Sequence, residues 1–238
     1  MAVGNAGGRA VLFPVIDIVP RDAGHVAADV ASLPEPDIVI FVSRNAVAHG
    51  HDAATGRARL AAVGDATAAA VRETLRRDVD ILPAAGFDSE ALLAETALRD
   101  VCGRCVRIVR GDRGRELLAD VLRERGARVD IVSAYARRRS RPSAAALTRL
   151  ADDWQAGRLA YVVAMSVASF DNLLELLPAA CRNALHRVRL VTPSSRVIQT
   201  SSDQAPEMRA LLATGPGADD LVAAMAADWQ TRTDTGHE

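Results

Sequence analysis

The feature that most restricts the fold of this chain is the alternation of short apolar runs with longer stretches of helical periodicity. Because strand–helix alternation builds parallel sheets with helices on both faces, we predict an α/β fold. The predicted strands are Ala10–Ile18, Asp37–Val42, Leu60–Val63, Asp78–Leu82, Cys105–Val109, Arg128–Ala134, Leu159–Met165 and Val188–Thr192, with Met208–Ala213 as a further candidate. The predicted helices include Asp65–Arg77, Ser89–Arg99, Arg113–Arg125, Ala144–Ala156, Val167–Leu177 and Asp219–Gln230.

Residues typical of helix ends support these boundaries. Asp65, Ser89 and Asp219 each precede an apolar helical pattern, where an N-cap is expected. Gly126 follows the helix predicted over Arg113–Arg125, where a left-handed residue commonly ends a helix. In parallel sheets, ligands bind beyond the carboxyl ends of the strands, where loops enter helices. The loops at these positions are therefore the candidates for function.

These loops occur as two ordered sets. Ser43 follows one strand and Ser166 follows a later one; Gly64-Asp65-Ala66-Thr67 is matched by Thr192-Pro193-Ser194-Ser195; and the residues from Phe87 to Leu92 are matched by those from Gly217 to Val222. Any flavodoxin-like domain places Ser, Thr, Asp and Gly at such junctions, because helix starts need caps. Three features repeated in the same order nevertheless indicate an internal duplication, and hence two lobes of one design.

Charge composition excludes several classes of chemistry. The 29 basic residues counted as Lys and Arg are all arginine. A chain without lysine has no Schiff-base lysine and no Walker lysine, so pyridoxal-phosphate and P-loop chemistry are excluded. An Arg- and Ala-biased genome explains the absence of lysine without a functional reason. With a net charge of −1, the chain as a whole is not attracted electrostatically to nucleic acid or to an anionic membrane.

The cysteines and the start of the chain carry little functional signal. Cys102 and Cys105 form a Cys-x-x-Cys pair, but Cys105 enters a predicted strand rather than opening a helix, and only Cys181 remains. We therefore predict neither a thioredoxin-like site nor a metal site. No apolar run approaches the roughly 20 residues of a membrane helix, and residues 1–9 lack the pattern of a signal peptide. The expected location is the cytoplasm.

Taken in order, several segments resemble those of uroporphyrinogen-III synthases, and the resemblance covers about Ala10 to Ala226. Each segment alone is weak evidence for this family, but the order and spacing of all the segments together are specific to it. They are Phe13–Ile18, Ile40–Val47, Ala62–Thr67, Val109–Leu118 and Val132–Arg137, together with the echoes around Ser166 and Ser194.

The resemblance implies two similar flavodoxin-like lobes, which are parallel sheets flanked by helices, joined by a two-stranded linker with a cleft between them. Lobe one would comprise residues 1–20 and 137–238, and lobe two residues 21–136. The strands that cross between the lobes would lie near Asp17–Arg21 and Ala134–Arg141. Family members normally open with a further strand and helix before the segment equivalent to Ala10–Ile18. We therefore expect lobe one to be shortened.

The same resemblance implies that the substrate is hydroxymethylbilane, closed to uroporphyrinogen III with inversion of ring D and loss of water, without a cofactor. Loss of the hydroxyl gives an azafulvene cation, and a spiro intermediate then allows the inversion. Tyr135 matches the family's linker tyrosine and would assist departure of the hydroxyl as a weak acid. The alternative for Tyr135 is an aromatic side chain packed at the end of a strand.

Substrate carboxylates would be met by helix N-termini and arginines beside them, since both bind anions. Each arginine alone could equally be a surface residue. The expected substrate-binding residues are Ser43, Arg44, Thr67, Ser89, Arg110, Gly111, Arg113, Ser166, Ser194, Ser195 and Arg196.

Two rival interpretations stay open. One is a shortened, non-catalytic relative that binds a tetrapyrrole or another polyanion. The other is a periplasmic-binding-protein-like or flavodoxin-like sensor with an unrelated small ligand, because fold alone does not fix function. Under the enzyme interpretation we expect a monomer that acts on a small-molecule substrate, with no nucleic acid or membrane as partner.

Overall fold

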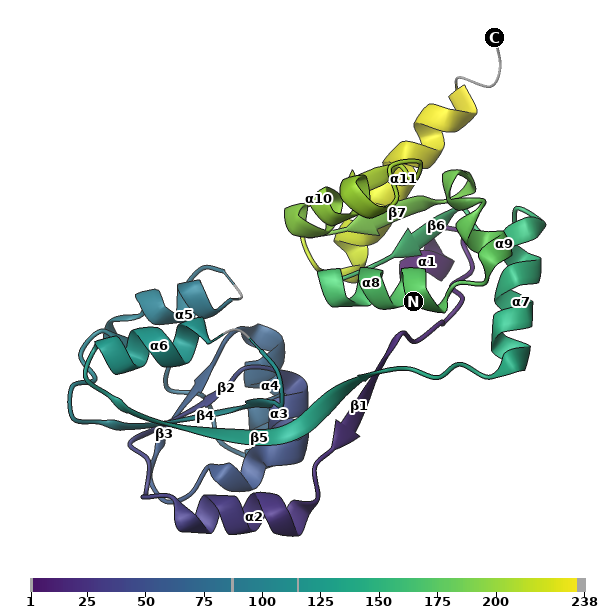
Figure 1. Cartoon of the computed structure of the whole chain (residues 1–238). Coiled ribbons are helices and arrows are strands. Elements are labelled where there is room, and N and C mark those ends of the chain that lie inside the picture. Colours follow the sequence, from purple (N-terminus) through teal and green to yellow (C-terminus); the bar gives the residue numbers. More distant parts are fainter. Residues whose placement is uncertain (1, 87, 115, 235–238) are drawn as a thin grey trace. The chain divides into compact units, whose positions relative to one another are not determined.

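The structure is a computed structural model that describes residues 2–86, 88–114 and 116–234 (Figure 1). Phe87 and Arg115, which belong to a repeated loop and a helix of the sequence prediction, lie outside this description. The chain divides into two compact units. Unit 1 holds the described residues up to Asp17 and from Arg139 onward, and unit 2 is Ile18–Arg138. No helix among the described residues is long and apolar enough to cross a membrane.

Unit 2 is built on a five-stranded sheet with the strand order β1-β5-β4-β2-β3. The pairs β3–β2, β2–β4 and β4–β5 are parallel, which confirms the predicted parallel α/β arrangement. Two hydrogen bonds, from Arg21 N–H to Ala134 O (3.0 Å) and from Ser140 N–H to Val15 O (3.1 Å), indicate that β1 runs antiparallel to β5. The strands are β1 (Ile16–Pro20), β2 (Ile38–Phe41), β3 (Arg59–Ala62), β4 (Cys105–Gly111) and β5 (Arg128–Arg139).

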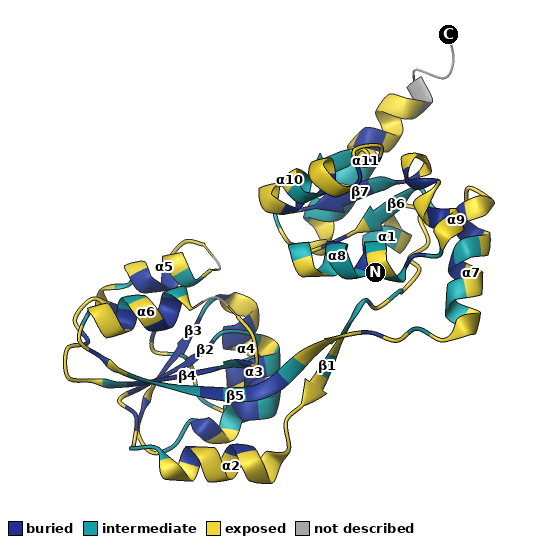
Figure 2. Ribbon diagram, viewed as in Figure 1, coloured by how far each residue is buried: buried dark blue, intermediate teal, exposed yellow. Residues whose placement is uncertain are grey.

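Helices cover both faces of this sheet because its strands are apolar on both sides. Val39 and Phe41 of β2 face α2, α3, α4 and the short helix η1. The alternate residues Ile38 and Ile40 face α5, α6 and η2. Figure 2 shows the inner strands β2 and β4, and most of β3, as buried, whereas β1 is largely exposed. The helices are α2 (Ala23–Ser32), α3 (Arg44–Gly50), η1 (His51–Ala53), α4 (Asp65–Leu75), α5 (Ser89–Ala94), η2 (Thr96–Leu98) and α6 (Leu117–Glu124).

Unit 1 contains a three-stranded parallel sheet with the order β6-β7-β8. Its main core gathers around Trp154, which is 1% exposed and donates from Nε1 to Ala184 O at 3.0 Å. Phe13 and Val15 pack against the same core. The elements are α1 (Ala2–Asn5), α7 (Ala144–Gln155), β6 (Tyr161–Val163), α8 (Val167–Leu176), α9 (Ala179–Arg182), η3 (Leu185–Arg187), β7 (Arg189–Thr192), α10 (Ser195–Gln204), β8 (Ala210–Leu212) and α11 (Ala218–Asp234).

A buried polar cluster holds the last helix on this sheet. Asp228 of α11 accepts from the Tyr161 hydroxyl (2.9 Å) and from Arg189 Nε (3.0 Å), and the Tyr161 hydroxyl also lies 3.1 Å from Met225 O. Burial, followed by the hydrogen bond to Asp228, raises the pKa of Tyr161. Since a buried carboxylate needs such partners, the cluster fixes α11 against β6 and β7.

Two predicted strands are corrected by the structure. The segment predicted as Ala10–Ile18 is irregular up to Val15, and the strand is Ile16–Pro20. Pro14 has no N–H for a ladder, and Phe13 and Val15 serve as core contacts instead. The segment Asp78–Leu82 makes only an isolated bridge from Ile81 to Ala61.

Several helix boundaries also differ from prediction. Gly64 and Asp88, rather than Asp65 and Ser89, occupy the N-cap positions of α4 and α5. Helix α6 starts at Leu117, after a turn, and helix α2 was not predicted at all. Gly126 has φ = 82°, which confirms the left-handed residue expected after α6.

We predict that Gly50→Ala destabilises unit 2. A Cβ at Gly50 would lie 2.6 Å from Val109 Cγ1 and 2.7 Å from Ala134 Cβ, both buried. Such overpacking typically costs about 1–3 kcal/mol. Gly114→Ala is the matched control, since its nearest neighbour would be 3.9 Å away. Urea titration gives the free energy of unfolding of each variant. Equal values for Gly50→Ala and Gly114→Ala would contradict the packing argument.

Candidate active site

Ser43 and Tyr135 meet in unit 2 although they are placed by β2 and β5, two strands on either side of β4. Ser43 follows β2 and caps α3, where its Oγ accepts from Ala46 N–H at 3.1 Å. The same Oγ lies 3.0 Å from the Tyr135 hydroxyl of β5. The two residues are 92 positions apart in the chain, so the parallel sheet is what brings these hydroxyls together.

The Tyr135 ring is buried, and the residue is 2% exposed. Its register partner is Gly111 of β4, where the β4–β5 ladder shifts between Arg110 and Gly111. A Cβ at Gly111 would lie 3.0 Å from Tyr135 Cε2 and 3.1 Å from Cζ. Because a side chain would press on the ring, glycine at this position allows the phenol to lie where it does.

Arg137 is a second neighbour of the Tyr135 hydroxyl and was not predicted as a site residue. Its Nη2 lies 3.5 Å from Tyr135 Oη, and its Cζ lies 5.9 Å from the ring centroid, within cation–π range. The His49 ring is 6.2 Å from the Tyr135 ring between centroids. Arg137 lies in the segment Ala134–Arg141 that was expected to cross between the lobes, and only its spacing of two from Tyr135 could have indicated a shared side of the strand.

Asp112 fastens this part of β5 and was likewise missed. Its N–H donates to Tyr135 O at 2.7 Å. Its carboxylate accepts from Arg137 N–H (3.2 Å) and from Arg138 Nη1 (2.6 Å). The bond from Arg138, followed by the one from the Arg137 amide, holds the pKa of Asp112 below its ordinary value.

The other predicted residues of unit 2 are not brought to the Tyr135 hydroxyl by any described contact. Arg44 and Arg113 are exposed, and Thr67 is buried in the first turn of α4. Arg110 donates from Nη2 to Glu116 at 2.6 Å, which lowers the pKa of Glu116. Ser89 is the first residue of α5 and directly follows the N-cap residue Asp88. Their proposed contacts with substrate stay predictions.

The predicted residues of unit 1 form a separate group at the carboxyl ends of β6 and β7. Ser166 caps α8, accepts from Ser169 N–H at 3.2 Å, and lies 2.8 Å from Ser169 Oγ. Ser194 is the N-cap residue of α10 without a side-chain capping bond, and its own N–H donates to Thr192 Oγ1. Ser195 and Arg196 are exposed in the first turn of α10.

Metal-binding groups and the Cys105 thiol are the remaining candidates for chemistry among the described residues. No group of three or more His, Cys, Asp or Glu side chains in the described ranges could hold a metal ion. Burial, followed by a hydrogen bond to Asp130, raises the pKa of the Cys105 thiol, which disfavours its reactive thiolate form.

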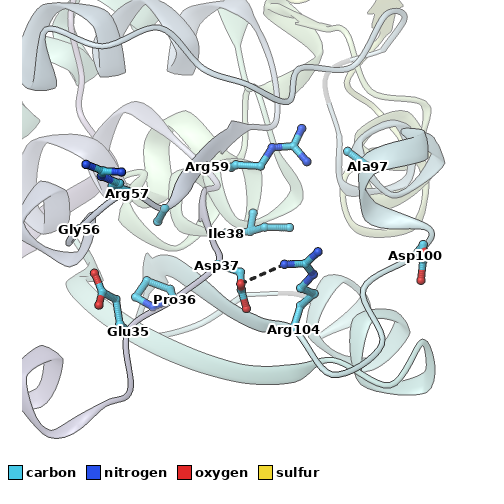
Figure 3. A pocket seen from close by; sticks show the side chains of 11 residues that line it. Glu35, Pro36, Asp37, Ile38, Gly56, Arg57, Arg59, Ala97, Asp100 and Arg104 are labelled. Carbon is cyan, nitrogen blue, oxygen red and sulfur yellow. Dashed lines mark hydrogen bonds and ion pairs between the residues drawn. The ribbon is translucent and has the colours of Figure 1, made fainter.

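A cavity of unit 2 lies at the opposite, amino end of the strands (Figure 3). It measures about 720 Å³ and lies beside the starts of β2 and β3. Asp37 accepts there from Cys105 N–H (2.8 Å) and Arg104 (3.2 Å). In parallel sheets, ligand sites lie at the carboxyl ends, so we place the candidate site at Tyr135. The charged residues around the cavity are Glu35, Asp37, Arg57, Arg59, Asp100 and Arg104.

Comparison with known proteins then identifies the family. The family model described as "Uroporphyrinogen-III synthase HemD" matches residues 2–223. The chain belongs to the uroporphyrinogen-III synthase family. Enzymes of this family cyclise hydroxymethylbilane in tetrapyrrole biosynthesis, a lyase reaction.

Two curated uroporphyrinogen-III synthases show the extent of the similarity. The protein of Escherichia coli strain K12 is 30% identical over 200 residues, which are 80% of each chain. That of Salmonella typhimurium is 36% identical over 133 residues, and this match spans about half of each chain, 52% of this one and 54% of the relative.

Solved structures of the family share the fold. The Helicobacter pylori enzyme matches with a TM-score of 0.64 at 11% identity, over 93% of this chain and 95% of that one. A mutant enzyme of Thermus thermophilus matches with a TM-score of 0.61 at 19% identity, over 97% and 93%. At such low identity, these matches show the α/β fold alone.

The Asp37 contacts generate a prediction about acid stability. The backbone N–H of Cys105, followed by Arg104, holds the pKa of Asp37 below its ordinary value of 3.8. The contribution of Asp37 to stability is therefore complete above the unfolded pKa and is lost as the pH falls through the lower folded pKa.

We expect Asp37→Asn to be less stable than the parent protein at neutral pH, and the difference to shrink in acid. Urea midpoints measured from pH 7 downward test this. Asp100→Asn is the control, because Asp100 borders the same cavity but makes no hydrogen bond among the described residues. A stability difference between the parent protein and Asp37→Asn that stays constant with pH would contradict the lowered pKa of Asp37.

Proposed function

We propose that this chain closes hydroxymethylbilane to uroporphyrinogen III, with inversion of ring D and loss of water, and that Tyr135 and Ser43 deliver the proton to the departing hydroxyl. The observation that carries this proposal is the 3.0 Å contact between the two hydroxyls, with the Arg137 guanidinium beside the phenol. The family membership supplies the reaction, and the geometry of unit 2 supplies the residues.

The donors and acceptors support one direction of hydrogen bonding. Arg137 can only donate, so its N–H points to the Tyr135 oxygen. Ser43 Oγ already accepts from Ala46 N–H, and its second lone pair can accept the Tyr135 O–H. The Ser43 O–H is then free to donate to a substrate. A chain of donors in one direction polarises each member, which strengthens the last donor.

The burial of Tyr135 favours a relay through Ser43. Tyr135 is 2% exposed, whereas Ser43 is only partly buried. In the proposed step, Ser43 gives its proton to the substrate hydroxyl as the carbon–oxygen bond breaks, and Ser43 takes the Tyr135 proton. Water leaves and the azafulvene cation forms. The proton lost when the final ring is closed returns to the phenolate, so the enzyme ends unchanged.

Besides delivering the proton, the protein must hold hydroxymethylbilane, a flexible polyanion, in a folded conformation. We propose that the two units are flavodoxin-like lobes joined by β1 and β5. Helix N-termini and arginines at the strand ends of each unit would bind substrate carboxylates, because backbone N–H groups and guanidinium groups both pair with carboxylate. Such binding positions the reacting ends, which is where most of the rate gain of an intramolecular closure arises. We further propose that the protein acts on this small molecule as a monomer.

A second candidate function is tetrapyrrole binding without turnover. The observation that favours it is the same burial of Tyr135, since a packed aromatic residue at this place has a structural use of its own. In that case the strand-end loops would hold a polycarboxylate ligand, and the phenol would only anchor Ser43.

An assay of product type separates the two candidates. Purified protein is given freshly prepared hydroxymethylbilane, the products are oxidised, and type I and type III uroporphyrins are separated by chromatography. We expect type III from the parent protein, and spontaneous type I alone would exclude the enzyme function.

The same assay tests the relay. Removing a general acid typically costs 10²–10⁴-fold, so we expect Tyr135→Phe to lower kcat by about a hundredfold. Ser43→Ala should lower kcat to a similar extent, because both variants break the same proton path. Tyr161→Phe is the control, since Tyr161 bonds to Asp228 in unit 1. Full activity of Tyr135→Phe in a folded protein would remove Tyr135 from the mechanism.

A further inference from the structure

Asp112 bonds to the backbone of β5 at two places, Tyr135 and Arg137, on either side of Ala136. Its backbone N–H bonds to Tyr135 O, and its carboxylate accepts Arg137 N–H. The same carboxylate accepts Arg138 Nη1 at 2.6 Å. One residue thus fixes the backbone of both the phenol and the guanidinium beside it.

The bulge in the ladder is what makes this arrangement possible. The register shift between Arg110 and Gly111 places Gly111, not Asp112, opposite Tyr135. Gly111 lies under the ring, and Asp112 lies one residue further along, beside the segment from Tyr135 to Arg137. Bulges re-aim side chains next to functional sites, and this one directs the Asp112 carboxylate at the Arg137 amide.

The Arg137 side chain needs such support. It is exposed, and its 3.5 Å contact with the Tyr135 hydroxyl is at the outer limit of a hydrogen bond. A long exposed side chain loses much conformational freedom when it is held in one place. Fixing its backbone amide through Asp112 restricts where the guanidinium can reach.

We propose that Asp112 is a positioning residue for the Tyr135 hydroxyl, acting chiefly through its bond to the Arg137 amide. This inference rests on the proposed function. Asp112 has no described contact with Ser43 or with the phenol oxygen, so its effect passes through Tyr135 and Arg137. The ion pair with Arg138 is a separate, partly exposed contact, and pairs of that kind contribute little.

Three variants separate the amide bond from the ion pair. Asp112→Ala removes both, Asp112→Asn keeps an oxygen that can accept the Arg137 amide, and Arg138→Gln removes the ion pair alone. We expect Asp112→Ala to lower kcat about tenfold with KM little changed, since misplacing a catalytic group by a fraction of an ångström lowers the rate on this scale. Asp112→Asn and Arg138→Gln should stay within about twofold of the parent. Equal losses in Asp112→Ala and Arg138→Gln would overturn the role of the amide bond.

A spectroscopic readout follows Tyr135 without substrate. The chain has two tyrosines, so incorporation of 3-fluorotyrosine gives two ¹⁹F resonances, and Tyr161→Phe assigns them. We expect the Tyr135 resonance to shift or broaden in Asp112→Ala and to stay in place in Arg138→Gln. Circular dichroism checks folding, and Asp112→Ser replaces the alanine variant if that one unfolds.

The two readouts also separate this inference from the proposed function. An unchanged Tyr135 resonance in Asp112→Ala would overturn the positioning role, whatever the parent protein catalyses. A moved resonance with unchanged kcat would overturn the link to catalysis. If the parent protein forms only type I product, the proposed function fails, and the catalytic part of this inference fails with it, while the resonance still reports whether Asp112 positions Tyr135.

Discussion

The arrangement of the candidate site depends on how β5 lies against β4. The ladder is regular from the Cys105–Arg128 pair to the Arg110–Ser133 pair and then shifts, so that Gly111 lies opposite Tyr135. Without the shift, the phenol would lie beside Asp112, whose side chain would occupy the space the ring needs. With it, the ring packs on a glycine, and the hydroxyl reaches Ser43 at the end of β2. A single irregularity in the sheet therefore determines which polar groups meet.

Burial of Tyr135 strengthens the hydrogen bond between the Tyr135 and Ser43 hydroxyls. In a low-dielectric interior, hydrogen bonds are stronger and less easily replaced by water than at the surface. The Tyr135 ring belongs to the same core as Val47, Val109 and Ala134, so it cannot reorient freely. The price is access, because a group that is 2% exposed must act through a neighbour. Ser43 is suited to that role, as its Oγ is fixed by the Ala46 amide and it is only partly buried.

Much of the fold could be predicted from the sequence because periodicity reports burial. The runs Ile38–Phe41 and Cys105–Val109 are apolar on both faces apart from Arg107, a pattern typical of strands buried on both sides. Ala10–Ile18 was misjudged since apolar residues around Pro14 are used as core contacts rather than in a ladder. Asp78–Leu82 was misjudged because strand-like composition does not ensure a partner, and it forms a single bridge.

The candidate site was only partly predictable for a different reason. Ser43 could be found because it follows a strand at a helix-capping position, and Tyr135 because it matches the linker tyrosine of the family that the sequence resembles. Their contact, and the roles of Asp112 and Arg137, depend on a register shift that leaves no compositional mark. Arg110, Gly111 and Asp112 are consecutive in the sequence, yet in the structure each has a different neighbour: Glu116, the Tyr135 ring and the Arg137 amide.

The two sets of loops share a design but differ in chemistry. Ser43 and Ser166 are both extended N-cap residues, with φ and ψ of −166° and 164° against −158° and 159°, and each accepts the amide three residues on. Ser43 has a phenol as its further partner, whereas the further partner of Ser166 is the hydroxyl of Ser169, another weak donor. A serine–serine pair can bind a carboxylate but has no strong acid behind it. Under the proposed function, the two serine-capped helix starts would both bind carboxylates, and the added tyrosine would make unit 2 the source of the proton.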